Sequence, residues 1–255
     1  MYGICNLSIV PLRATASDIA EMTNQLLFGE HFTIIEKNQN WSKIKLAFDG
    51  FEGFIDNKQY ETITEDFYHK INEEQEVYTK EIVDVISNTN NEILTIPIGA
   101  SLPFLNGNKF SINKVEYLFE GESISGEKGK NAIKQFAFSF LNTPFLWGGK
   151  SPFGIDCSGF TQLIYKLCGY QLLRNASEQA TQGEVLSFIE ESEPGDLAFF
   201  DNEEGEIVHV GIILNDYHII HAHGKVRIDT LDHSGIFNAD LQKHTHKLRM
   251  IKKLV

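Results

Sequence analysis

Short runs of alternating hydrophobic and polar positions fill the first half of the chain. Clusters rich in glycine, asparagine and aspartate separate these runs, which is the pattern of short strands joined by turns. The pattern predicts strands over residues 3–12, 25–28, 32–37, 41–46 and 53–56, and again over 82–86, 92–96, 101–104, 109–112 and 116–119. The acidic stretch 64–76 between the two groups is predicted to be a linker or a short surface helix. Strands at this spacing predict small barrels.

The second half mixes helical and strand patterns. Residues 120–130 are polar and glycine-rich, and we expect a domain boundary there. Residues 131–141 then show a helical period. A second amphipathic helix has Phe160, Leu163, Ile164 and Leu167 on one face and is predicted to end at Gly169. Two apolar runs, 206–214 and 218–224, flank a turn at 215–217, which predicts an antiparallel hairpin.

Cys157 lies where that second helix begins. A glycine-rich loop leads into Asp156, a favourable N-cap residue, so Cys157 takes the first helical position. The positive end of the helix dipole is expected to stabilise a thiolate there, and the thiolate is the nucleophilic form of cysteine. The alternative is that Cys157 is a small core residue.

A cysteine nucleophile needs a base and a group that orients the base. The predicted hairpin brings His209 and His221 onto neighbouring strands. We therefore assign His209 as the base and His221 as the residue that orients it. The alternative for each is a hydrogen-bonded core histidine.

Four sequence blocks occur in the order found in the NlpC/P60 family of cysteine peptidases, which the chain resembles from about residue 125 to its end. The blocks are Leu146-Trp147-Gly148-Gly149 through Asp156-Cys157-Ser158-Gly159-Phe160, Pro194-Gly195-Asp196-Leu197, His209-Val210-Gly211-Ile212 and Ile220-His221-Ala222. The resemblance implies an α+β, papain-like catalytic domain over residues 125–255. It also implies hydrolysis of murein peptides between γ-D-glutamate and a diamino acid, with Cys157, His209 and His221 as the catalytic residues.

The first part of the chain resembles bacterial SH3 domains. The resemblance lies in residues 25–30, 40–41 and 49–55 and gives one SH3-like domain over 1–62, with a second, weaker one over 77–122. SH3-like domains joined to this catalytic unit resemble peptidases that recycle cell-wall peptides with a free N-terminal L-Ala. We expect Glu21, Asp49 or Glu52 to bind that ammonium group, although each is alternatively a plain surface carboxylate.

The α-carboxylate of D-glutamate needs hydrogen-bond donors. Ser158 lies next to the nucleophile, and the loop 174–179 contributes Arg174 and Ser177. Arg174 alternatively covers the domain surface. The resemblance implies a second role for Asp156 beside capping, which is contact with the substrate backbone. It also implies that Trp147 contributes to substrate binding.

The charge and the cysteine content of the chain limit the classes of partner and the location that we expect. The net charge of −13 argues against nucleic acid, which requires basic surfaces. No apolar run is long enough to span a bilayer, and no signal peptide is visible, so a cytoplasmic location is expected. The three cysteines form no disulfide framework, and Cys5 and Cys168 are expected to be reduced and buried. No cofactor is implied. The two His-x-His pairs at 221–223 and 244–246 lack accompanying ligands, so no metal site is assigned.

Alternatives to a recycling peptidase remain. An exported hydrolase would use the SH3-like domains to bind polymeric peptidoglycan. A non-catalytic wall-peptide binder is a third possibility, because Phe145 replaces a tyrosine that is common in the family two residues before the tryptophan. Amidase or acyl-transfer activity would use the same nucleophile.

Overall fold

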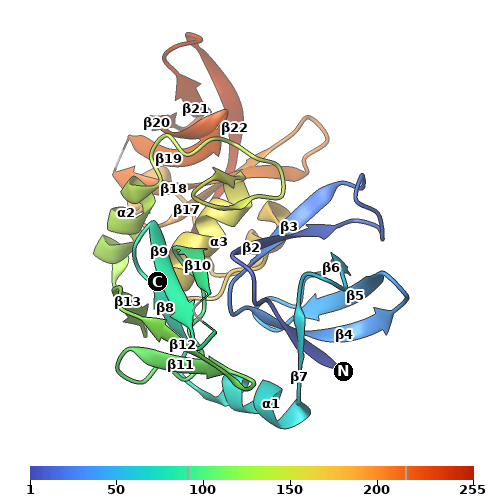
Figure 1. The fold of residues 1–255 in the computed structure, drawn as a ribbon. Helices are drawn as coiled ribbons and strands as arrows, with labels where there is room; N and C mark the ends of the chain where they lie inside the picture. Colours follow the sequence, from blue (N-terminus) through green and yellow to red (C-terminus); the bar gives the residue numbers. More distant parts are fainter. Residues whose placement is uncertain (91, 216) are drawn as a thin grey trace. The chain divides into compact units, whose positions relative to one another are not determined.

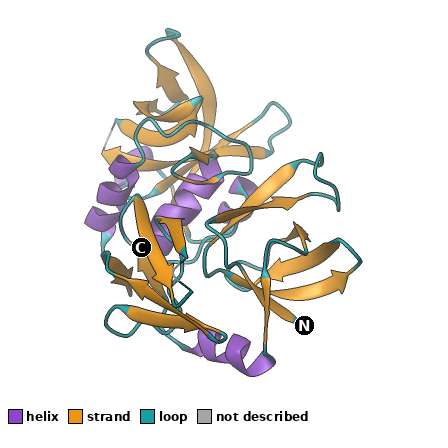
Figure 2. Ribbon diagram, viewed as in Figure 1, coloured by secondary structure: helices purple, strands orange, loops and turns teal. Residues whose placement is uncertain are grey.

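The computed structural model describes residues 1–90, 92–215 and 217–255. The chain forms two compact units, which are drawn in Figure 1 and coloured by secondary structure in Figure 2. Unit 1 comprises residues 1–126 and 147–152, and unit 2 comprises 127–146 and 153–255. Residue 216, within the predicted turn 215–217, lies outside the described residues. No described helix has the length and apolar character needed to cross a membrane.

The first sheet of unit 1 has seven strands in the order β3-β2-β6-β5-β4-β1-β7. Its strands are β1 (Tyr2–Ile4), β2 (Ile9–Arg13), β3 (Met22–Leu27), β4 (His31–Lys37), β5 (Trp41–Leu46), β6 (Glu52–Asp56) and β7 (Glu61–Ile63). The strand predicted over 3–12 is broken into β1 and β2. The break occurs because the backbone of Cys5 turns to bond Glu30 and Gly29 instead of continuing the ladder.

The remainder of unit 1 begins with helix α1 (Glu65–Glu73), which lies inside the predicted linker or helix and is capped by the Thr64 side chain. A four-stranded sheet, β10-β9-β12-β11, and a separate β13-β8 pair follow. These strands are β8 (Val77–Thr79), β9 (Val83–Asn88), β10 (Ile93–Pro97), β11 (Lys109–Ile112), β12 (Val115–Phe119) and β13 (Ser123–Ser125). The strand predicted over 101–104 is wrong, because Pro103 and the left-handed Phe104 (φ 58°) end the extended run.

The two parts of unit 1 share a core. Ile4 and Phe28 from the first sheet pack in one hydrophobic cluster with Ile86, Phe110 and other buried residues of the second. Phe28 contacts the ring of Phe110 edge-on at 6.0 Å. The two predicted SH3-like regions therefore do not pack as separate bodies.

Unit 2 is built on an antiparallel sheet with helix α3 (Cys157–Leu167) packed against it. The sheet order is β16-β22-β17-β18-β19-β20-β21, and β22 also pairs with β21, so six of the strands close into a ring. The strands of this sheet are β16 (Glu184–Leu186), β17 (Leu197–Asp201), β18 (Ile207–Asn215), β19 (His218–His223), β20 (Lys225–Asp232), β21 (Gly235–Asn238) and β22 (Lys243–Lys253), and β15 (Gly154–Ile155) lies outside it. The helical elements are α2 (Lys130–Ser139), α3, α4 (Ala176–Gln179) and the 3₁₀ turn η1 (Ile189–Glu191).

The segment 147–152, which leads toward the nucleophile, is part of unit 1 and includes β14 (Lys150–Ser151). The Lys150 ammonium contacts both carboxylate oxygens of Glu30 at 3.0 Å, and both side chains are nearly inaccessible to solvent. The Lys150 backbone N–H donates to Gln25 Oε1 at 2.8 Å. Gly148 has a positive φ of 73°, and a side chain there would collide with the Met22 carbonyl. These contacts anchor the segment to the first sheet.

We expect Lys150→Met to destabilise the protein by about 3–5 kcal/mol, because it leaves the Glu30 charge buried without its ammonium partner. The double variant Lys150→Met/Glu30→Gln should recover part of that loss. Urea unfolding followed by circular dichroism measures both. Lys43→Met, which breaks the exposed Lys43–Glu52 pair, is the matched control and should change the unfolding midpoint little. Equal effects of Lys150→Met and Lys43→Met would contradict the prediction.

Candidate active site

Cys157 is the first residue of α3, as predicted, and residues 158–167 behind it are all buried. The Asp156 side chain caps the helix by accepting the Gly159 backbone N–H at 2.6 Å. The cap satisfies one of the free amide groups at the helix start. The nucleophile is thereby held on a rigid, fully packed element.

Asp156 is also one half of a buried ion pair. Arg174 approaches it as a fork, with Nη2 at 2.6 Å from Oδ2 and Nη1 at 3.0 Å from Oδ1. Arg174 Nη1 also donates to Ser158 Oγ at 3.0 Å. Arg174 is only 2% exposed, so the alternative that it covers the surface is wrong. Arg174, Asp156 and Ser158 thus form one buried polar cluster at the start of α3, and their contacts with a substrate stay a prediction.

The loop after Arg174 is ordered by short-range contacts. Ser177 is exposed on α4, whereas Gln179 is buried and donates to the carbonyls of Ser158 and Leu173 at 3.0 and 2.8 Å. Gln179 therefore ties this loop to the first turn of α3.

The two predicted histidines meet as the hairpin requires. His209 on β18 and His221 on β19 are both buried, and Nε2 of His209 lies 2.8 Å from Nδ1 of His221. The rings are edge to face, with centroids 5.0 Å apart. This arrangement lets His221 orient the ring of His209.

The environment of the Cys157 thiol favours its neutral form. Burial, followed by the adjacent Asp156 carboxylate, raises the pKa of Cys157 to about 12, although the Val210 and Ser158 backbone N–H groups and Arg174 act in the opposite direction. Burial therefore outweighs the stabilisation of a thiolate that the helix start offers through the Ser158 backbone N–H. The bond to Val210 also places the thiol beside the residue that follows His209.

His209 complements this neutral thiol. Burial, with the nearby rings of His221 and His246, holds the pKa of His209 well below its usual value. Burial also lowers the pKa of His221, against the opposing effect of Asp229. At neutral pH the site therefore contains a neutral thiol and neutral imidazoles, so the nucleophile must lose its proton to a base during the reaction.

His246 on β22 is a neighbour that the sequence analysis considered only for metal binding. Its ring stacks on that of His209, with centroids 4.2 Å apart and planes 26° apart. Burial, with His221 and His223, lowers the pKa of His246 to about 3. Side-chain nitrogens of His209, His221 and His246 lie within 4.8 Å of one another. The sequence assigned no metal here, and that stays a prediction.

The substrate residues predicted in the first region lie in unit 1. Glu21 accepts a hydrogen bond from Trp147 Nε1 at 2.5 Å, and both side chains are exposed. Glu52 is ion-paired with Lys43 at 2.8 Å, and the hydrogen bond from Lys43 lowers its pKa. Asp49 accepts the Phe51 backbone N–H at 2.9 Å. Glu21 therefore contacts the segment leading to the nucleophile.

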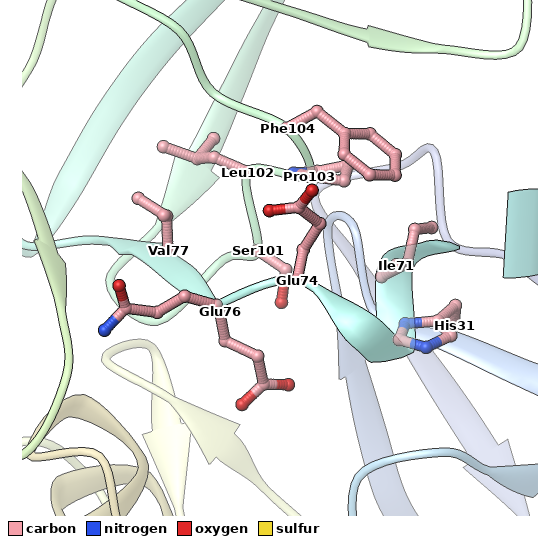
Figure 3. A pocket seen from close by; sticks show the side chains of 10 residues that line it. His31, Ile71, Glu74, Glu76, Val77, Ser101, Leu102, Pro103 and Phe104 are labelled. Atoms are coloured by element: carbon pink, nitrogen blue, oxygen red, sulfur yellow. The ribbon is translucent and has the colours of Figure 1, made fainter. Parts of the chain in front are cut away.

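Two pockets hold none of the predicted site residues. One, in unit 1, is lined by residues that include His31, Glu74, Glu76 and Phe104, and Figure 3 shows these side chains around it. Its volume of about 20 Å³ leaves room for roughly one water molecule. The other, about 280 Å³, lies in unit 2 against Tyr217, Leu231 and His233.

Asp229 on β20 was missed by the sequence analysis. Its Oδ2 lies 3.1 Å from Nε2 of His221, on the side of that ring away from His209. The alternation Arg227-Ile228-Asp229 on the strand after the hairpin is the available sequence signal, because alternate residues share a face. His246 carries no comparable signal, since its place depends on how β22 closes the ring of strands.

Two known families match parts of the chain. Residues 142–248 match the NlpC/P60 family, and residues 12–59 match the bacterial dipeptidyl-peptidase SH3 domain. The second predicted SH3-like region, 77–122, stays a prediction.

Three curated relatives are named as dipeptidyl-peptidases. The chain is 27% identical over 226 residues to a γ-D-glutamyl-L-lysine dipeptidyl-peptidase of Bacillus cereus, covering 79% of this chain and 67% of the relative. It is 42% identical over 103 residues to the Bacillus subtilis protein of the same name, covering 39% of this chain and 34% of that protein. Dipeptidyl-peptidase 6 of Lysinibacillus sphaericus is 26% identical over 246 residues, covering 84% of this chain and 85% of that protein.

A solved structure shares the fold along the whole chain. An NlpC/P60 family protein from Bacillus cereus superposes with a TM-score of 0.84 at 19% identity, covering 99% of both chains. At this identity the likeness establishes the fold alone.

We expect iodoacetamide to label Cys157 and to spare Cys5 and Cys168, which are fully buried. Because the pKa of Cys157 is raised, its thiolate fraction should increase about tenfold per pH unit, and the labelling rate should rise from pH 7 to pH 10 without a plateau. Mass spectrometry of tryptic peptides measures the rate at each site. Cys157→Ala is the control. A labelling rate that levels off below pH 7 would show a preformed thiolate and would contradict the raised pKa of Cys157.

Proposed function

We propose that this chain, whose residues 142–248 match the NlpC/P60 family, hydrolyses the bond between γ-D-glutamate and a diamino acid in cell-wall peptides. The observation that carries the proposal is the Cys157–His209–His221 arrangement within unit 2: a nucleophile on a capped, buried helix beside two hydrogen-bonded histidines. The names of the relatives from both Bacillus species support this bond as the target.

The reaction proceeds through a thioester. His209 takes the thiol proton as Cys157 Sγ attacks the γ-carbonyl carbon of D-glutamate, and the tetrahedral oxyanion is stabilised by backbone N–H groups at the start of α3. His209 then gives the proton to the departing amine, and the carbon–nitrogen bond breaks. Water attacks the thioester with His209 again acting as base, which releases the D-glutamyl carboxylate and restores the thiol.

We further propose that the substrates are free peptides with an N-terminal L-Ala, whose ammonium is bound by a carboxylate of the first sheet. Glu21 is favoured, because Trp147 joins it to the segment before the nucleophile. Glu52 already has Lys43 as its counter-ion. A cytoplasmic location fits this recycling role and the unpaired state of Cys5, Cys157 and Cys168, since reducing compartments keep thiols free.

We expect His209→Ala to lower kcat by about 10²–10⁴-fold, which is the usual contribution of a general base. His221→Gln should retain more activity, because the glutamine side chain can still accept a hydrogen bond from the base. Hydrolysis of L-Ala-γ-D-Glu-diamino acid followed by chromatography measures both variants. Full activity in His209→Ala would remove the proposed mechanism.

N-acetylation of the substrate should lower kcat/KM by about tenfold or more, because it removes the charge that a carboxylate would bind. Glu21→Gln should reproduce this loss on the free peptide, whereas Asp49→Asn and Glu52→Gln serve as matched controls. Digests of free, acetylated and muramyl-linked peptides, compared by mass spectrometry, give the rates. Equal rates on all three would favour an envelope hydrolase over a recycling enzyme.

A further inference from the structure

We propose that Asp229 is a positioning residue for the catalytic histidines, whose carboxylate sets the tautomer of His221 and thereby directs a free nitrogen of His209 toward proton transfer. The proposal deepens the peptidase function proposed above and rests on it.

Strand register brings Asp229 to His221. On the β19–β20 pair, His221 lies opposite Arg227, and Asp229 is two residues further along β20. Residues two apart on a strand share a face, so Asp229 is the diagonal neighbour of His221. Nε2 of His221 and Oδ2 of Asp229 are 3.1 Å apart, and neither side chain is appreciably exposed.

Arg227 holds the Asp229 carboxylate in place. Its Nε lies 2.7 Å from Oδ2, and its Nη2 donates to Oδ1 at 2.8 Å. Nη2 also donates to the exposed Asp240 at 2.9 Å. Although burial alone would raise it, the pKa of Asp229 is lowered by the hydrogen bonds from His221 and Arg227. Asp229 is therefore an ionised carboxylate at neutral pH.

An ionised carboxylate can only accept hydrogen bonds. This fixes the donor and the acceptor in each hydrogen bond from Asp229 through His221 to His209. Nε2 of His221 must carry a proton to donate to Asp229. In a neutral ring, Nδ1 of His221 is then an acceptor, so Nε2 of His209 must donate to it across the 2.8 Å contact. Nδ1 of His209 is consequently the nitrogen with the lone pair that takes the Cys157 proton.

The same carboxylate stabilises the charged intermediate. When His209 accepts the thiol proton it becomes an imidazolium in a buried site, next to the rings of His221 and His246. Asp229 supplies a negative charge through the His221 hydrogen bond, partly offset by Arg227. A triad's third member acts on its histidine in this way. Here the acidic group acts through an intervening imidazole.

The test compares Asp229→Asn with Asp240→Asn. Both variants remove one carboxylate from Arg227, but Asp240 contacts neither histidine, so it controls for loss of the ion pair. We expect Asp229→Asn to lower kcat by about 10- to 100-fold with KM nearly unchanged, and to shift the pH–rate profile. The titratable or charged groups around the pair are His209, His223, His246 and Arg227. Asp240→Asn should behave as the parent enzyme. Equal kcat values and profiles for the two variants would overturn the proposal.

A second measurement is independent of any substrate. Nitrogen-15 NMR of histidine-labelled Cys157→Ala at neutral pH reports which ring nitrogen carries the proton. We expect both His209 and His221 to be protonated at Nε2, and Asp229→Asn in the same background to give a mixture of tautomers for His221. A His221 protonated at Nδ1 in the Cys157→Ala protein would overturn the proposal even if Asp229→Asn failed to fold. If peptide hydrolysis were absent but the tautomers were as expected, the proposed function would fail and the positioning role would stand.

Discussion

The catalytic half of this protein depends on the buried ion pair between Asp156 and Arg174. Helix α3 is surrounded by protein, so the amide groups at its start cannot all be satisfied by water. Asp156 satisfies one of them, but a buried carboxylate is costly without a counter-ion. The guanidinium of Arg174 provides two hydrogen bonds to that carboxylate. The position of Cys157 at the helix start follows directly from this pair.

The Asp156 carboxylate that caps the helix also makes the neighbouring thiol harder to ionise. Asp156 adds to burial in raising the pKa of the Cys157 thiol, so the helix start does not deliver a ready thiolate. Reactivity must then come from the base, and the buried, neutral His209 suits that role. Its orientation depends on a line of hydrogen bonds across three neighbouring strands, from β18 through β19 to β20. Positioning of the nucleophile and activation of the nucleophile are thus assigned to different parts of unit 2.

Unit 1 uses a second buried ion pair for a different purpose. Lys150 lies only seven residues before the nucleophile in the sequence, yet its ammonium is enclosed with Glu30 of the first sheet. The segment 147–152 is consequently anchored to that sheet, and the Trp147–Glu21 hydrogen bond adds a contact with the loop before β3. These contacts hold residues 147–152, which precede Cys157 along the chain, to the SH3-like region.

The sequence by itself determined the features that rest on local interactions. Asp156 as cap, Cys157 as the first residue of a helix, and His209 facing His221 across a hairpin all follow from contacts between residues close along the chain. Capping and hairpin pairing obey geometric rules that a short window of sequence contains. The strand predicted over 101–104 shows the limit of that window, because Pro103 and the left-handed backbone of Phe104 end the extended run.

Tertiary structure alone decided which charges and rings surround those residues. Asp229 reaches His221 through the register of β20, and His246 reaches His209 because β22 closes the ring of strands. Arg174 lies beneath Asp156 instead of on the surface, and Glu30 meets Lys150 across 120 residues. The pKa of Cys157 depends on such enclosure, because burial and neighbouring charges shift an ionisation equilibrium more than one helix terminus does. These effects depend on distances in space, which the order of residues along the chain does not specify.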